Sequence, residues 1–204
     1  MISNLPQLAI AGLASLVLTT GCASSVTLNH YTLSSQAIRD RGGPQPEAFA
    51  QSVGLGPVTL PDMVDRPQLV LRTSEHRVIL AGSHRWAGPL KTEFARVLAD
   101  NLVHLLSTRA IFSYPQHGAE HADVRVSVNV QHFESVLGKT ATIDAIWTVR
   151  LVDGTQRTDR ASVQEAVSDG SYDALVAAHS RALLTISQNI ASTIRGGTAA
   201  TPRH

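Results

Sequence analysis

The chain has 204 residues, 43% hydrophobic and 16% charged, a composition typical of one globular domain and not of a disordered chain or a coiled coil. Its 17 Lys and Arg residues nearly balance 16 Asp and Glu residues, so it lacks the basic excess of a wide nucleic-acid-binding surface. A single cysteine excludes a disulfide framework, a CxxC redox pair and a thiolate zinc site within the chain.

Residues 1–21 are predicted to be a signal peptide. They contain no charged side chain, and their apolar stretch is about half the ~20 residues that a membrane-spanning helix needs. The sequence Leu-Thr-Thr-Gly that precedes Cys22 resembles a bacterial lipobox, in which the chain is cut before a cysteine that receives acyl chains. Thr19 stands where such motifs usually have Leu, and a plain signal peptide with an incidental cysteine is the alternative. We predict lipidation of Cys22, because the only cysteine of the chain lies where a lipobox requires it.

Acylation of Cys22 has consequences for location. Two or more acyl chains hold a protein stably on a membrane. The next residue is Ala23 and not the Asp that often retains lipoproteins in the inner membrane, so similarity to Gram-negative sorting implies the periplasmic face of the outer membrane. Residues 22–50 are rich in Ser, Gln, Gly and Pro, which predicts a lipidated tether. Within it, Tyr31 and Leu33 alternate as in a short edge strand.

Hydrophobic periodicity predicts three strands, at residues 53–60, 68–73 and 76–80. Gly88 and Pro89 then favour the start of a helix. The helix is predicted from an apolar stripe at helical spacing, which comprises Leu90, Phe94, Val97, Leu98, Leu102, Leu105 and Leu106. Residues 113–122 are predicted to be a loop.

The second half of the chain predicts three strands and one helix. The strands lie at residues 124–130, 143–151 and 156–166, with turns between them. The helix has Ser171 or Asp169 as its N-cap and ends at Gly196-Gly197. Its apolar stripe comprises Tyr172, Leu175, Val176, His179, Leu183, Ile186, Ile190 and Ile194.

This order of elements predicts an α+β fold. We expect a two-layer sandwich, with a largely antiparallel sheet and two amphipathic helices on one of its faces. The single domain is predicted to span residues 51–197, and residues 198–204 are predicted to be a disordered tail.

The sequence motifs tested for catalysis fit simpler interpretations. His117 and His121 match the HxxEH pattern of inverted zinc proteases. That chemistry needs both histidines on one face of a helix and a third ligand, whereas Pro115 and Gly118 disfavour a helix, so a solvated loop is the favoured interpretation. His179 lies on an apolar helix stripe, which indicates a core or boundary residue.

Two further patterns are equally weak. The Gly54-Leu-Gly pattern lacks the third glycine and the helix of a dinucleotide-binding loop. Asp62 and Asp65 fit a turn better than an acid–base pair. We therefore predict no catalytic residues, no cofactor and no metal, and expect that the protein is not an enzyme.

Two stretches are more specific than packing requires: residues 60–72 (LPDMVDRPQLVLR) and residues 84–90 (HRWAGPL). With the lipobox, Tyr31-Thr-Leu and a late Ala-Ile-Trp147, they resemble the PqiC/YmbA family of ABC-type transport auxiliary lipoproteins. Gly88 departs from the acidic residue expected in that family, and the resemblance covers about residues 22–195. It implies a non-enzymatic accessory component of an MCE/ABC-type intermembrane lipid transport system, with an MCE-domain protein as the partner.

The candidate partner-binding residues come from the same two stretches, because Trp and Arg are enriched in protein–protein hot spots. They are Asp65, Arg66, Pro67, Gln68, Arg85 and Trp86. The alternative is structural: Trp86 packs at the helix start and Arg66 pairs with Asp65. An oligomeric MCE tunnel as the partner would favour a homo-oligomer of this chain. The alternative function is an anchored envelope scaffold or assembly module that binds an outer-membrane protein without lipid transport.

Overall fold

The computed structural model describes residues 27–37 and 47–199. The predicted signal peptide, the lipidation of Cys22 and the end of the predicted tail lie outside the described residues. The described elements are β1 (Asn29–Tyr31), β2 (Val53–Thr59), β3 (Gln68–Ser74), β4 (Arg77–Trp86), α1 (Leu90–Leu105), β5 (Ile111–Ser113), α2 (His117–Glu120), β6 (Val124–Val136), β7 (Thr140–Leu151), β8 (Gln156–Ala166) and α3 (Tyr172–Ala199).

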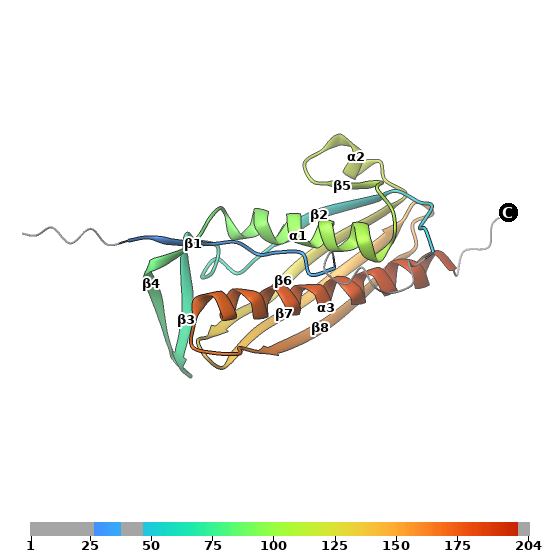
Figure 1. Ribbon diagram of the computed structural model, residues 1–204. Coiled ribbons are helices and arrows are strands. Elements are labelled where there is room, and N and C mark those ends of the chain that lie inside the picture. Colours follow the sequence, from blue (N-terminus) through green and yellow to red (C-terminus); the bar gives the residue numbers. More distant parts are fainter. Residues whose placement is uncertain (1–26, 38–46, 200–204) are drawn as a thin grey trace, which may run out of the picture.

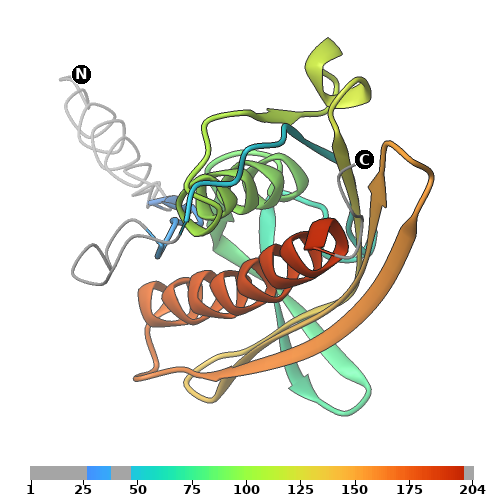
Figure 2. The same ribbon diagram turned by 90° about the vertical axis from the view of Figure 1, so that its right-hand side faces the viewer.

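The strands form two sheets. The larger sheet has the order β5-β2-β6-β7-β8, and the smaller has the order β1-β4-β3. Helices α1 and α3 lie on one face of the larger sheet, which curves around α3, and the smaller sheet closes one end of this sandwich (Figures 1 and 2). The predicted α+β two-layer fold with two helices on one face is therefore confirmed.

The longest strand pairs are antiparallel. β7 pairs with both β6 and β8 in this way, as does β3 with β4. By contrast, β2 runs parallel to β5 and β6, and β1 runs parallel to β4. The sequence did not predict these parallel pairs, since parallel neighbours are joined by long crossovers and not by a turn.

Both predicted helix stripes form the core. Phe94 and Leu98 of α1 and Leu183 and Ile186 of α3 have no exposed surface. Ser171 caps α3 as predicted, because its hydroxyl accepts a hydrogen bond from the backbone N–H of Ala174 at 3.1 Å. The carboxylate of Asp169, the other predicted cap, accepts one from the backbone N–H of Ser171 at 2.7 Å.

Two predicted strands are too short, each for an identifiable reason. β6 continues from Val130 to Val136, but a register shift between Val130 and His132 breaks the apolar alternation that the prediction relied on. β4 continues from Leu80 to Trp86 through a polar stretch. That stretch stays extended because β1 pairs with it on one side and the start of β3 on the other.

The predicted loop at residues 113–122 is wrong in part, because it contains the single helical turn α2. Ala119 of this turn is buried, and the turn packs closely on the neighbouring strands. A Cβ at Gly118 would come within 2.6 Å of the Phe112 ring, and one at Gly54 within 2.1 Å of the Ala119 carbonyl oxygen. Glycine at both positions permits the close packing that holds the turn in a helical conformation.

The predicted end of the last helix is also wrong. α3 continues through Gly196 and Gly197 to Ala199, so residues 198 and 199 are helical and not part of a disordered tail. Gly197 is buried, and a Cβ on it would lie 3.9 Å from both Leu151 and Arg157. Glycine residues usually end a helix. Here the helix continues past Gly196 and Gly197 because it packs against the ends of β7 and β8.

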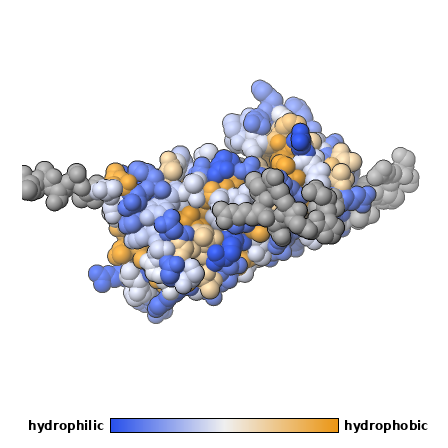
Figure 3. Space-filling view, viewed as in Figure 1, coloured by the Kyte–Doolittle hydropathy of each residue, from blue (hydrophilic) through white to orange (hydrophobic). Residues whose placement is uncertain are grey.

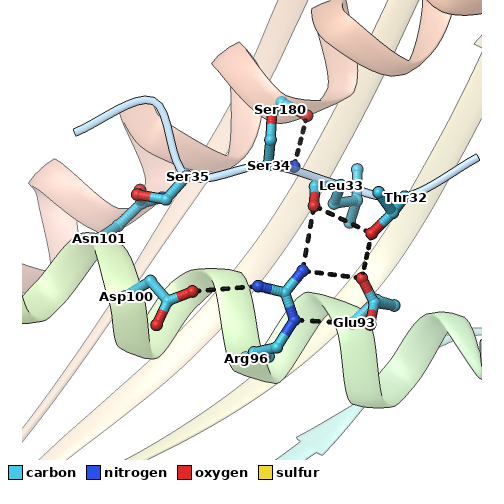
Figure 4. A network of polar contacts seen from close by, with 9 residues as sticks. All are labelled: Thr32, Leu33, Ser34, Ser35, Glu93, Arg96, Asp100, Asn101 and Ser180. Atoms are coloured by element: carbon cyan, nitrogen blue, oxygen red, sulfur yellow. Dashed lines mark hydrogen bonds and ion pairs between the residues drawn. The ribbon is translucent and has the colours of Figure 1, made fainter. Parts of the chain in front are cut away.

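The predicted tether is corrected for residues 27–37, because this segment belongs to the domain. After β1 it lies between α1 and α3, where the Leu33 side chain is 1% exposed (Figure 4). The backbone N–H of Ser34 donates to the Ser180 hydroxyl at 3.2 Å, and Arg96 donates to the Leu33 carbonyl at 3.1 Å. The Ser35 hydroxyl donates to Asn101 at 2.7 Å. These contacts fix the segment to both helices.

Two further features support this correction. Arg96 and the Thr32 hydroxyl of this segment both donate hydrogen bonds to Glu93, and together they hold the pKa of that carboxyl below its usual value. Beyond the part that is not described, the backbone N–H of Phe49 donates to the Leu106 carbonyl at 2.9 Å. The segment from β1 to Ser35 therefore belongs to the domain, and six residues of the sequence separate Cys22 from Asn29.

Candidate partner-binding site

The two stretches singled out in the sequence meet at the base of the β3–β4 hairpin. Gln68 is the register partner of Arg85, and the backbone N–H of Trp86 donates to the Pro67 carbonyl at 2.7 Å. The Tyr-Thr-Leu segment joins them, because Tyr31 is the register partner of Trp86 in β1. Three separate motifs of the family resemblance are thus neighbours in space.

A tight turn before β3 presents the charged residues of this region. The backbone N–H groups of Val64 and Asp65 donate to the Pro61 carbonyl at 3.0 and 3.2 Å. The Val64 side chain is 4% exposed and anchors the turn in the core. Asp65, Arg66 and Pro67 are exposed, and Asp65 and Arg66 form no ion pair with each other among the described contacts. Both charges therefore face solvent.

The other candidate residues are less accessible. Gln68 and Arg85 are half-buried, and the Nε atom of Arg85 is buried without a hydrogen-bond partner among the described residues. Trp86 is 5% exposed, and its ring meets that of Phe133 edge-on, with ring centroids 6.1 Å apart. The Trp86 side chain therefore packs between the small sheet and β6, which leaves Asp65, Arg66 and Pro67 as the accessible part of the set.

Behind Trp86 lies a buried histidine that joins the sheet to α3. The His179 ring stacks on Phe133 with centroids 4.0 Å apart, and its Nε2 atom lies 2.8 Å from the Ser135 hydroxyl. His179 has no exposed surface, and its Nδ1 atom has no hydrogen-bond partner among the described residues. Burial lowers the pKa of His179 to about 3, so the ring is neutral near pH 7. The sequence-based interpretation of His179 as a core residue is confirmed.

The sequence reasoning missed an aromatic cluster beside this region. The Tyr31 hydroxyl lies 2.7 Å from Nδ1 of His84, and the His84 ring stacks on Tyr172 with centroids 3.6 Å apart. Burial raises the pKa of Tyr31. The cluster ties β1 and β4 to the start of α3. No local pattern could have revealed it, because its members come from three distant parts of the chain.

A small groove next to the turn was missed as well. It has a volume of about 60 Å³ and is lined mainly by apolar side chains, including Met63, Val70, Val78 and Phe133. The ion pair of Arg72 with Glu134 joins the hairpin to β6 at its side. The groove is lined by residues of the exposed turn, such as Met63, and by residues of the β3–β4 hairpin, such as Val78.

The described residues contain no group of three or more His, Cys, Asp or Glu side chains that could hold a metal ion. His117 and His121 of the HxxEH motif are both exposed. Within the same part of the chain, no helix has the length and apolar character needed to cross a membrane.

The fold is a two-layer α+β domain in which Asp65, Arg66 and Pro67 form an exposed turn at the base of the β3–β4 hairpin. The chain belongs to the family of ABC-type transport auxiliary lipoprotein components, whose family model matches residues 31–191. The family resemblance inferred from the sequence is therefore confirmed.

Solved structures share the fold. The crystal structure of an uncharacterized protein is 21% identical, with a TM-score of 0.68, and the match covers 82% of this chain and 99% of that chain. A protein from Xanthomonas campestris is 15% identical, with a TM-score of 0.63 and coverage of 86% and 97%. No curated protein matches the sequence significantly.

Proposed function

We propose that the protein is an outer-membrane lipoprotein on the periplasmic face that serves, without catalysis, as an accessory component of an MCE/ABC-type intermembrane lipid transporter. The observation that carries the proposal is the meeting of three family motifs at the base of the β3–β4 hairpin, next to an exposed turn. Family membership supports a role beside an ABC transporter. Packing against Phe133 accounts for Trp86, but it does not require the exposed Asp65 and Arg66 side chains.

The partner in this proposal is the MCE-domain protein, which docks on Asp65, Arg66 and Pro67, with Gln68 and Arg85 at the edge of the contact. The turn is rigid, because Val64 is buried and two backbone hydrogen bonds close on Pro61. A rigid turn loses little conformational freedom when it binds. Arg66 forms no ion pair with a described residue and can donate up to five hydrogen bonds to acceptors on a partner.

Docking is tested by charge reversal. Arg66→Glu should weaken binding to the MCE-domain protein about 30-fold, the equivalent of about 2 kcal/mol for a hot-spot residue. The melting temperature should barely change, because Arg66 is exposed. Surface plasmon resonance with the purified MCE domain measures the first quantity and a thermal melt the second. Arg125→Glu, which reverses an exposed charge on β6, is the matched control, and equal affinities for the two variants would contradict the docking site.

Anchoring is tested at Cys22. We expect a Cys22→Ser chain, exported by a signal peptide that ordinary signal peptidase removes, to fold and to appear in the soluble periplasmic fraction. The wild-type chain should sediment with outer membranes, because several acyl chains give stable attachment. Fractionation after a high-salt wash measures the difference. A Cys22→Ser protein that still sediments with the outer membrane would show that acylation is not the anchor.

A further inference from the structure

The small sheet has apolar side chains that the core does not cover. Val78, Ile79 and Leu80 are consecutive residues of β4 and are 37%, 43% and 48% exposed. Successive side chains of a strand point to opposite faces, so both faces of the outer hairpin are apolar here. Leu28, which directly precedes β1 of the same sheet, is 44% exposed. Hydrophobic residues are visible on the surface at this end of the molecule (Figure 3).

The same end of the molecule holds β1, the first described strand after Cys22 in the sequence. β1, β3 and β4 lie together there (Figure 1), and Asn29 pairs with His84. Leu80 precedes His84 by four residues, or about 13 Å along the strand. Cys22 precedes Thr27 by five residues, which span at most about 18 Å. If Cys22 is acylated, as the proposed function holds, the small sheet has to lie close to the bilayer.

The charge of the small sheet is suited to phospholipid. Residues 27–31 and 68–86 contain Arg72, Arg77 and Arg85 but only one acidic residue, Glu75. Arg72 is paired with Glu134, whereas Arg77 and Arg85 form no ion pair with a described residue. Cations beside apolar side chains are the combination that binds the interface of a bilayer containing anionic lipids.

From these observations we infer that the outer half of the β3–β4 hairpin is a second membrane contact, in which Val78, Ile79 and Leu80 enter the interface of the phospholipid bilayer beside the acyl anchor. The inference rests on the proposed lipidation of Cys22. The two contacts together fix the orientation of the domain. They place the Asp65-Arg66 turn, at the base of the same hairpin, close to the membrane surface, where a lipid-transferring partner has to arrive.

The test uses the mature acylated protein, whose only native thiol is blocked by acylation. Leu80→Cys then provides one thiol for an environment-sensitive fluorophore, and Ile79→Cys provides a second position on the opposite face of the strand. Val152→Cys is the matched control, since Val152 is an apolar residue that is 77% exposed, on the turn between β7 and β8. The proteins are reconstituted into phosphatidylethanolamine–phosphatidylglycerol vesicles with or without a lipid that carries a nitroxide quencher on its acyl chain.

We expect the labels at Leu80 and Ile79 to shift to shorter emission wavelengths and to be quenched several-fold more strongly than the label at Val152. Equal, weak quenching at all three positions in protein that floats with the vesicles would overturn the membrane contact and leave the anchor intact. Protein that fails to float would overturn the proposed anchor, and the inference with it. A label at Leu80 that responds only when the MCE domain is added would also overturn the inference, because the hairpin would then bind protein and not lipid.

Discussion

Trp86→Ala should lower the free energy of unfolding by about 3–5 kcal/mol, the usual cost of truncating a buried tryptophan. The Trp86 side chain is 5% exposed and its ring meets Phe133 edge-on. Removing the ring leaves a cavity between the small sheet and β6, where few neighbouring side chains can move to fill it. A loss of this size is a large share of the stability of a typical domain.

Urea denaturation of the non-acylated Cys22→Ser protein, with and without Trp86→Ala, measures this effect. Arg66→Ala is the control, because Arg66 is exposed and should change stability by less than about 0.5 kcal/mol. The folded fraction of Trp86→Ala should still bind the MCE domain. An unchanged unfolding midpoint combined with a large loss of binding would mean that Trp86 is an interface residue and that its burial is released on docking.

Acidification should destabilise the fold through His179. The pKa of this ring is about 3 in the folded chain and about 6.5 in the unfolded chain. Its contribution to stability is therefore complete above about pH 6.5 and is lost as the pH falls toward 3, because the unfolded state binds a proton that the folded state does not. Between pH 7 and pH 5 the loss amounts to about 2 kcal/mol.

His179→Gln is the matched variant, because glutamine does not titrate and can keep a hydrogen bond to Ser135. Urea denaturation at several pH values between 5 and 7 should give a distinctly flatter stability profile for His179→Gln than for the wild type. Carboxylates such as Glu93 lose their contribution only at lower pH, since their folded pKa lies below its usual value. Parallel profiles for the two proteins in this range would contradict the assignment to His179.

Local pattern predicted the elements whose residues share one regular face. The stripes of α1 and α3, the β6–β7–β8 meander and the cap at Ser171 all follow from spacing within a single segment. The pattern failed where tertiary contacts override local preference. Gly196 and Gly197 stay helical against the β7–β8 region, and the bulge after Val130 hides the rest of β6.

The candidate site shows the same division. The sequence identified Asp65, Arg66 and Trp86 through motifs, but it could not separate exposed from buried members of the set. Only the pairing of β3, β4 and β1 brings the motifs together and turns Trp86 inward. The polar composition of the N-terminal segment predicts a tether. The Ser35 side chain instead binds α1, the Ser34 backbone binds α3, and Leu33 is buried between the two helices.

The transport role is tested most directly by purifying the tagged, acylated protein from detergent-solubilised envelopes after mild crosslinking and identifying what is bound to it. We predict that an MCE-domain protein is recovered together with the permease and ATPase of its ABC transporter, and that Arg66→Glu sharply reduces this recovery. Recovery of an outer-membrane protein without any MCE or ABC subunit, equally for wild type and Arg66→Glu, would contradict the transport role and favour an anchored scaffold.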